Sequence, residues 1–312
     1  MNNLNYIKKL ICITPMVEIT YKFNNKINKV YVKLEWYSLT GSVKDKVAYQ
    51  IILDAYKSKN LSKNQKIVEV SSGNMGISIS AIGNLTKNPV TIIMPETMSD
   101  ERKKLIKSYN ANLVLTKDFK EAFKLCEEYK KEGYFCTNQF ENLSNIKAHY
   151  NITAKEISTK IKDKKVNNFV AGVGTSGTLI GISKRLKKLN IKCYGLEPFN
   201  ARILSGVKPF KNHKLQGLSD EILPKIYDKN VIDGIVQIKD DDAIAMSQKL
   251  CSCLSLGVGI SSGANFLGCV LKGDTCVTVF PDDNKKYLST DLLKTVKSDL
   301  VDKIELLNIK YL

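Results

Sequence analysis

Lys44 stands at the start of a predicted helix, directly after the turn-forming residues of the segment TGSVKDK (40–46). The residues after it place apolar side chains at the spacing of a helix that packs on a core: Val47, Ala48, Ile51, Ile52 and Ala55. A lysine amine in this position is either a solvated charge or a nucleophile held for covalent chemistry. Two loops elsewhere in the sequence bear on that choice.

The first loop, VAGVGTSGT (170–178), lies between a predicted strand and a predicted helix. Its Gly172, Gly174 and Gly177 have the G-x-G-x-x-G spacing of a dinucleotide-binding turn, and Glu197 closes the next predicted strand. The same loop offers backbone N–H groups and hydroxyls that suit a single phosphate: Gly174, Thr175, Ser176, Gly177 and Thr178. A nicotinamide or flavin site, a monophosphate site and a plain tight turn all remain open.

The second loop, VEVSSGNMGIS (68–78), again joins a strand to a helix. Ser71, Ser72, Asn74 and the backbone N–H groups form an anion site suited to a carboxylate, which the helix dipole assists. A second anion site at a second helix start is not part of a dinucleotide-binding domain. One lysine, one phosphate site and one carboxylate site together indicate pyridoxal 5'-phosphate with an amino acid attached.

The segments around these motifs alternate between predicted strands and helices. The predicted strands cover residues 66–70, 90–94, 113–115, 169–171, 193–197 and 276–280. The predicted helices lie between them, at 76 onward, 100–109, 123–129, 179–189 and 241–253. This alternation predicts an α/β protein with two doubly wound domains and mostly parallel sheets, in which ligands bind beyond the carboxyl ends of the strands. Topology rather than composition places the domain boundary near residues 145–155.

The charge of the chain favours small anionic ligands over nucleic acid. The net charge is +17, but its lysines are spread over nearly every segment and its arginines are few: Arg102, Arg185 and Arg202. No alternation of basic and aromatic residues suits base stacking. A lysine-rich solvated surface still attracts phosphorylated cofactors and anionic substrates. Because no signal segment or membrane span is visible, we expect a cytoplasmic protein that binds neither nucleic acid nor membrane.

The cysteines and histidines give no pattern typical of a metal site. The chain has eight cysteines without a CxxC pair and only two histidines. The cysteines lie mostly in apolar segments: Cys12, Cys126, Cys136, Cys193, Cys251, Cys253, Cys269 and Cys276. We interpret them as reduced core residues, and His149 and His213 as structural residues. No metal is expected.

Ten sequence blocks, in order and over nearly the whole chain, resemble the cysteine synthases (O-acetylserine sulfhydrylases). The blocks are TPMV, KLEWYSLTGSVKDK, SSGNMG, MPETMSDERKKLI, NQFENLSNIKAHY, GVGTSGT, LEP, HKLQGLSDEILP, GISSGAN and PDDNKKYLST. These enzymes belong with cystathionine β-synthase to the fold-type II pyridoxal phosphate enzymes, whose fold is that of tryptophan synthase β. The resemblance implies a smaller, mobile substrate-loop domain at 45–148 and a larger, phosphate-binding domain from 1–44 and 149–312. It also implies a homodimer, with serine acetyltransferase as a candidate partner.

The resemblance assigns roles to individual residues. Lys44 would be the Schiff-base lysine, Asn74 the partner of the cofactor's phenolic oxygen, and Gly174 to Thr178 the phosphate site. Four residues would lie against the substrate carboxylate: Ser71, Ser72, Met75 and Gln139. Met75 stands where the family has a threonine, so one hydroxyl is missing from that loop. The implied reaction is β-replacement, in which O-acetyl-L-serine and sulfide give L-cysteine and acetate.

Asp283, in PDDN, departs from the family pattern. It stands where the family is expected to have the serine that meets the pyridine nitrogen of the cofactor. A carboxylate there would favour the protonated ring, which is the stronger electron sink. The alternative is a shift of one residue that leaves Asp283 in solvent.

A second departure is GLSDE (217–221), which replaces a small glycine-rich loop of the family. Asp220 or Glu221 either faces the β-carbon of the substrate as a general base or is a solvated loop acid. An acid there would repel hydrosulfide and favour the reverse sense, in which L-cysteine enters, hydrogen sulfide leaves, and water or another thiol adds. That reaction would form L-serine or a thioether. A nicotinamide oxidoreductase and a cofactor-binding protein without turnover are more remote alternatives.

Overall fold

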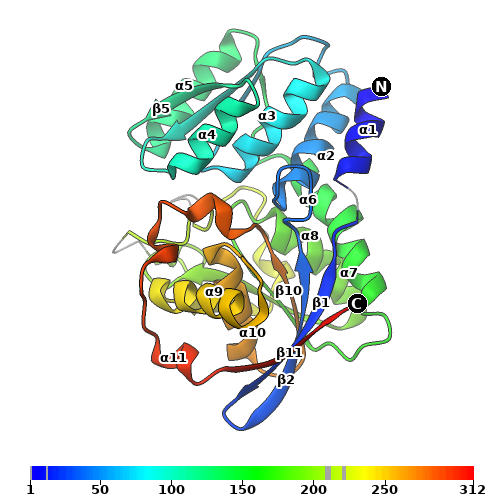
Figure 1. Cartoon of the computed structure of the whole chain (residues 1–312). Coiled ribbons are helices and arrows are strands. Elements are labelled where there is room, and N and C mark those ends of the chain that lie inside the picture. Colours follow the sequence, from blue (N-terminus) through cyan, green and yellow to red (C-terminus); the bar gives the residue numbers. More distant parts are fainter. Residues whose placement is uncertain (1, 12, 208–211, 220–222) are drawn as a thin grey trace.

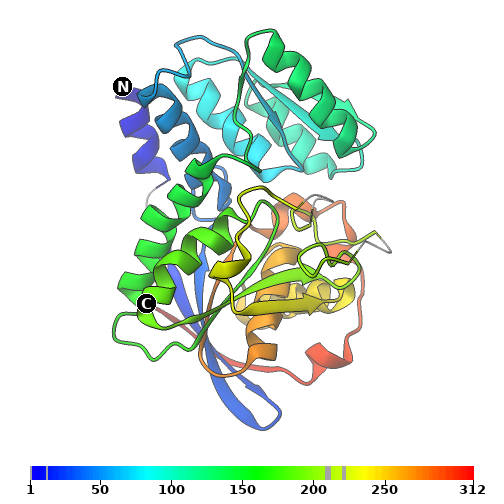
Figure 2. The same ribbon diagram turned by 180° about the vertical axis from the view of Figure 1, so that it is seen from behind.

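The protein contains two separate β-sheets with helices packed against them, one above the other in Figures 1 and 2. The computed structural model describes residues 2–11, 13–207, 212–219 and 223–312. Most neighbouring strands in both sheets run parallel. The prediction of an α/β fold with mostly parallel sheets is therefore confirmed.

The larger body is built on a seven-stranded sheet of order β11-β1-β2-β10-β7-β8-β9. Its strands are β1 (Met16–Phe23), β2 (Lys26–Leu34), β7 (Asn168–Gly172), β8 (Lys192–Pro198), β9 (Gly234–Ile238), β10 (Cys276–Phe280) and β11 (Glu305–Tyr311). Its helices are α7 (Ala154–Lys160), α8 (Gly177–Leu186), α9 (Asp240–Leu254), α10 (Ile260–Lys272) and α11 (Asp299–Asp302). The strands from β2 across to β9 run parallel.

One edge of this sheet is antiparallel, which the sequence analysis did not predict. Strand β1 pairs antiparallel with both β2 and β11. Asn24 and Asn25, which connect β1 to β2, have φ values of 48° and 59°. Asparagine tolerates this left-handed conformation, which a tight hairpin turn requires at both central residues.

The smaller body is built on a four-stranded parallel sheet of order β5-β4-β3-β6. Its strands are β3 (Ile67–Val70), β4 (Val90–Pro95), β5 (Asn112–Thr116) and β6 (Phe135–Cys136). Its helices are α1 (Asn2–Leu10), α2 (Lys44–Lys57), α3 (Asn74–Thr86), α4 (Asp100–Ser108) and α5 (Phe119–Lys131). Every residue of β3 and β4 is buried. Such central strands lie between helices on both faces, so their sequences are nearly continuous apolar runs.

The boundary between the two bodies differs from the prediction at the N-terminus. The prediction placed residues 1–44 in the larger domain, but α1 packs beside α2 and α3 of the smaller body (Figure 1). Leu4, Ile7 and Ile11 are buried in the same core as α2 and α3. These side chains share one helix face because they recur at helical spacing. At the other end, α6 (Leu143–Ala148) continues into a π-helical turn at His149–Thr153, where the boundary was expected.

The fold places three helix starts of interest near one another. The loop from β3 to α3, the loop from β7 to α8 and the first residue of α2 all contribute to one cavity. Within the described ranges, no helix has the length and apolar character needed to cross a membrane.

Candidate active site

One cavity collects residues from all three motifs that the sequence analysis singled out. Its lining includes ten of the predicted site residues: Lys44, Ser71, Ser72, Asn74, Met75, Gln139, Gly174, Thr175, Ser176 and Thr178. These residues come from both bodies, so the cavity lies where the two sheets face each other. Their convergence agrees with the expectation that ligands bind beyond the carboxyl ends of parallel strands.

Lys44 is the first residue of α2, and its side chain points toward the glycine-rich loop before α8. Its Nζ donates a hydrogen bond of 3.2 Å to Oγ1 of Thr175. Its backbone N–H donates to Oγ of Ser42 at 3.3 Å. The side chain is half-buried, and the contact with Thr175 directs its amine into the cavity.

The loop before α8 has the close packing and the polar atoms of an anion site. A Cβ on Gly177 would lie 1.9 Å from Oδ1 of Asn145, and one on Gly174 would lie 2.2 Å from the carbonyl oxygen of Gly217. Ser176 has a φ of 70°, and its buried Oγ has no hydrogen-bond partner among the described residues. Backbone N–H groups at this helix start and an unpartnered hydroxyl fit a phosphate group.

His149 lies buried beside the glycine-rich loop that precedes α8. It is fully buried, with Nε2 3.1 Å from Oγ1 of Thr178 and Nδ1 3.1 Å from Oγ1 of Thr153. Burial and then the charge of Lys44 lower the pKa of His149 to about 3. The imidazole is consequently neutral, and its contacts agree with a structural role.

The loop between β3 and α3 is held in place by its own side chains. Oγ of Ser71 accepts hydrogen bonds from the backbone N–H groups of Gly73 at 3.0 Å and Gly76 at 2.9 Å. Gln139 lies beside this loop and donates from Nε2 to the carbonyl oxygen of Val70 at 3.1 Å. The loop is thus preorganised with backbone N–H groups at the start of α3, where a carboxylate is favoured.

Glu69 lies buried beneath this loop, a feature that the sequence analysis did not note. Its Oε2 accepts a short hydrogen bond from Oγ1 of Thr137, two residues before Gln139. Burial raises the pKa of Glu69 to about 7, against the lowering effect of its hydrogen bonds to Thr137 and Gln139. This carboxyl group therefore connects β3 to the segment that carries Gln139.

Asp283 does not lie where the sequence analysis placed it. It is not among the cavity-lining residues, and its Oδ2 lies 3.8 Å from Nζ of Lys285 at the outside. Its backbone is extended, so consecutive side chains point to opposite sides, and Asp282 faces inward instead. Ser261, at the start of α10, lines the cavity. The structure thus differs from the prediction that Asp283 meets the pyridine nitrogen.

Four polar side chains that line the cavity were given no site role by the sequence analysis: Arg102, Gln216, Ser261 and Tyr287. Each lies within one of the ten blocks that resemble the cysteine synthases, and that resemblance was the signal that could have identified it. Arg102 is 1% exposed and donates from Nη1 to the carbonyl oxygen of Ser72 at 3.1 Å. Its guanidinium also lies 4.9 Å from the ring centroid of Tyr287.

A buried ion cluster lies behind the helix start that carries Lys44. Nζ of Lys46 is 2.9 Å from both Oε1 of Glu35 and Oε2 of Glu156, and Lys33 is 2.8 Å from Glu156. Burial by itself would raise the pKa of Glu35, but the charges of Lys46 and Lys33 hold it at about 2. Lys46 therefore joins the smaller body to the larger one.

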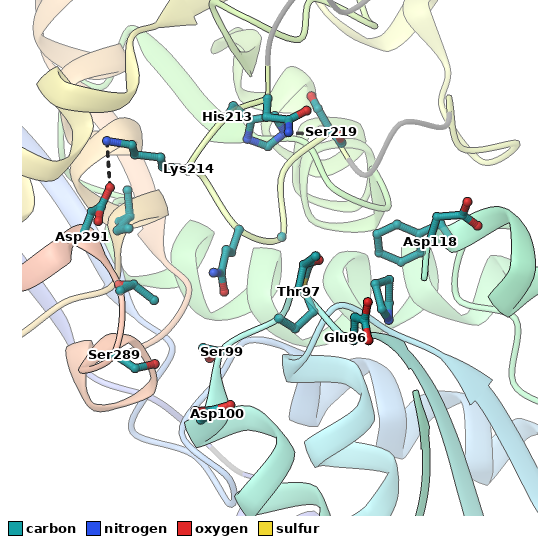
Figure 3. A pocket seen from close by; sticks show the side chains of 18 of the residues that line it. Glu96, Thr97, Ser99, Asp100, Asp118, His213, Lys214, Ser219, Ser289 and Asp291 are labelled. Carbon is teal, nitrogen blue, oxygen red and sulfur yellow. Dashed lines mark hydrogen bonds and ion pairs between the residues drawn. The ribbon is translucent and has the colours of Figure 1, made fainter. Parts of the chain in front are cut away.

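A larger cavity of about 770 Å³ adjoins the first and shares Gln216 and Gly217 with it. Figure 3 shows Glu96, Asp100 and Asp118 along one side of this cavity. Along the other side lie His213, Lys214, Ser219 and Asp291, with Lys214 and Asp291 paired at 2.8 Å. Asp220 and Glu221, which were predicted to face the substrate or the solvent, lie outside the described residues.

Comparison with known proteins decides between the ligands that these loops could hold. A family model described as pyridoxal-phosphate dependent enzyme matches residues 7–282. The chain belongs to this family. It is therefore a pyridoxal phosphate-dependent enzyme.

Several proteins similar to this chain are named cysteine synthases. A cysteine synthase from Staphylococcus aureus is 38% identical over 298 residues, which cover 92% of this chain and 96% of that protein. The solved structure of a cysteine synthase from Entamoeba histolytica has a TM-score of 0.87 and 34% identity, and the match covers 95% of this chain and 93% of that one. The resemblance to cysteine synthases is confirmed.

Another relative is named for producing hydrogen sulfide. The structure of a hydrogen sulfide-producing enzyme from Fusobacterium nucleatum has a TM-score of 0.95 and 40% identity, with coverage of 100% of this chain and 99% of that one. Proteins similar to this chain thus carry names for both directions of sulfur chemistry.

Proposed function

We propose that this enzyme catalyses β-replacement on an L-amino acid that carries a leaving group on Cβ. The first candidate reaction converts O-acetyl-L-serine and sulfide to L-cysteine and acetate. The observation that carries the proposal is the position of the Lys44 amine, in one cavity with a phosphate site and a carboxylate site. Such an arrangement suits an amino acid bound covalently through its nitrogen.

Each of these residues would have its own role in the reaction. Lys44 would hold the cofactor covalently, and its amine, once free, would remove the proton from Cα. The loop from Gly174 to Thr178 would bind the phosphate, and Asn74 would donate to the phenolic oxygen. Bound pyridoxal phosphate supplies the electron sink that makes the Cα proton removable.

The substrate carboxylate lies against the loop that begins at Ser71. Ser71, Ser72, Gln139 and backbone N–H groups at the start of α3 would bind it, because Oγ of Ser71 accepts two hydrogen bonds inside the loop and keeps its own O–H to donate. Met75 is buried and offers no hydroxyl. The carboxylate site therefore has one side-chain hydroxyl fewer than a loop with threonine at this position.

A second candidate reaction has L-cysteine as substrate and hydrogen sulfide as product, with water or another thiol as the nucleophile. The full-length likeness to a hydrogen sulfide-producing enzyme favours it.

Amino-acid product analysis of the purified holoenzyme separates the two reactions. One sample contains O-acetyl-L-serine and sulfide, and another contains L-cysteine alone, each with a Lys44→Ala control. Faster formation of cysteine supports the first reaction, and faster release of sulfide with formation of serine or a thioether supports the second. If neither sample differs from the Lys44→Ala control, the proposed function is wrong.

The assembly of the enzyme is a separate proposal. We expect a homodimer, and we expect serine acetyltransferase to bind it if cysteine synthesis is the reaction. Light scattering on the purified enzyme gives the mass of the assembly. A mass of one chain, 35.0 kDa, would contradict the dimer.

A further inference from the structure

Asp282 is fully buried between two residues that line the active-site cavity. Its Oδ2 accepts a hydrogen bond of 2.7 Å from Nδ2 of Asn74 and one of 2.8 Å from the hydroxyl of Tyr287. Asn74 begins α3 in the smaller body, whereas Asp282 follows β10 in the larger one. The hydrogen bond between them therefore connects the two bodies next to the cavity.

The carboxyl group of Asp282 has little freedom to turn. A Cβ on Gly259 would lie 2.1 Å from Oδ1 of Asp282 and 2.7 Å from the ring of Tyr287. The backbone N–H of Gly259 also donates to the carbonyl oxygen of Asp282 at 3.1 Å. On the other side, Arg102 lies over the ring of Tyr287 at 4.9 Å. Close packing therefore fixes both the carboxyl group of Asp282 and the ring of Tyr287, whose hydroxyl donates to it.

This contact determines which way the side-chain amide of Asn74 is turned. A carboxylate only accepts hydrogen bonds, so the amide must present its nitrogen rather than its oxygen to Asp282. Nδ2 carries two hydrogens, and it donates one of them in the hydrogen bond to Asp282. The second N–H is left to donate elsewhere, and Oδ1 of Asn74 has no partner among the described residues.

We infer that Asp282 is a positioning residue, which turns the Asn74 amide so that its second N–H faces the phenolic oxygen of the cofactor. The inference rests on the proposed function in one respect, the role of Asn74 as the partner of that oxygen. Asp282 itself does not line the cavity and acts through Asn74. Tyr287 supports it by donating to the same carboxylate oxygen.

The test replaces Asp282 with asparagine, which has the same shape but can offer either an oxygen or a nitrogen to Asn74. The matched control is Asp283→Asn, which removes the neighbouring carboxyl group outside the cavity. Two quantities are measured: the dissociation constant of pyridoxal 5'-phosphate from titration of the apoenzyme, and the absorption maximum of the bound cofactor. For Asp282→Asn we expect about tenfold weaker binding and a shifted absorption maximum. For Asp283→Asn we expect neither change.

Two more variants distinguish positioning from a general loss of structure. Asn74→Ala should weaken binding of the cofactor, and adding Asp282→Asn to it should have little further effect, because the two residues act as one unit. Tyr287→Phe keeps the packing but removes one donor, so it should shift the absorption maximum in the same direction by less. If Asp282→Asn does not fold, Tyr287→Phe decides the question through the same two measurements.

The outcomes for this inference and for the proposed function are separable. Unchanged binding and spectrum in Asp282→Asn, additive effects of the Asn74 and Asp282 substitutions, or a larger change in Asp283→Asn would each overturn the inference. In each case the wild-type enzyme would still bind the cofactor and turn over substrate. If the wild-type enzyme binds no pyridoxal phosphate, the proposed function fails as well.

Discussion

The amine of Lys44 donates a hydrogen bond of 3.2 Å to the hydroxyl of Thr175, although 131 positions separate them in the chain. This contact joins the start of α2 to the phosphate site before α8. It places the Lys44 amine next to the loop whose backbone N–H groups begin α8. The same contact would let Lys44 meet a cofactor whose phosphate lies in that loop.

Replacement of Lys44 by alanine should remove the covalent attachment of the cofactor. We expect the visible absorption band that borohydride reduction bleaches to disappear, and turnover to fall by about 10³-fold or more, because among the described residues Lys44 is the one lysine that lines the cavity. Mass spectrometry of the reduced wild-type enzyme should find the cofactor on Lys44. The control is Lys57→Ala at the exposed end of the same helix, which should keep the band and the rate. If borohydride reduction still attaches the cofactor covalently to the Lys44→Ala variant, the assignment of Lys44 is wrong.

Replacement of Gly177 by alanine should disturb the phosphate site by overpacking. The new methyl group would lie 1.9 Å from Oδ1 of Asn145, a buried side chain that already donates to the carbonyl oxygen of Gln139 and to Thr175. We expect a loss of about 1–3 kcal/mol in the free energy of unfolding and weaker binding of pyridoxal phosphate. Urea denaturation and cofactor titration measure the two effects.

The Asn145→Ala substitution provides the control for Gly177→Ala. In the double variant the methyl group meets no amide, so part of the stability should return. If the double variant is as unstable as the sum of the two single variants, the clash with Asn145 is not the cause.

Replacement of Lys46 by methionine should destabilise the protein strongly. It would leave the buried Glu35 and the partly exposed Glu156 with Lys33 as their remaining partner. Breaking a buried pair on one side costs about 3–5 kcal/mol, whereas Lys57→Met on the surface should change the free energy of unfolding by less than about 0.5 kcal/mol. Urea denaturation of both variants gives the comparison. Equal stability of the two would show that the cluster contributes little.

The carboxyl group of Glu69 should make stability depend on pH near neutrality. Its pKa is about 7 in the folded protein and 4.5 is its ordinary value, so the folded state binds the proton more tightly. Stability should therefore be highest below about pH 4.5 for this group and fall as the pH rises to 7, by about 3 kcal/mol in total. Measurements of the free energy of unfolding between pH 5 and 8 would reveal this fall.

Glu69→Gln tests this assignment because glutamine keeps the shape and does not titrate. The variant should lose that part of the pH dependence and become more stable than the wild type above pH 7. The exposed Glu132→Gln should keep the wild-type profile. An identical profile for wild type and Glu69→Gln would mean that Glu69 does not titrate in this range.

Local patterns were enough to predict the elements and loops of the site. The strands at 66–70 and 169–171 are close to β3 and β7, and the glycine-rich loops after them do precede helices. Hydrophobic periodicity and turn residues act over a few neighbouring positions, so they are visible in one sequence. The identity of the cofactor followed from the same loops once a lysine was placed beside them.

Packing over long sequence distances decided what local patterns could not. The sequence analysis predicted that Asp283 meets the cofactor, but the backbone after β10 turns Asp282 toward Asn74 and leaves Asp283 away from the cavity. The sequence analysis gave Lys46 no role, because its partner Glu156 lies 110 positions away in the chain. The sequence by itself determined the chemistry of the site and the elements that carry it. Only the tertiary structure decided which charges are buried against one another, because burial and facing depend on every element that packs there.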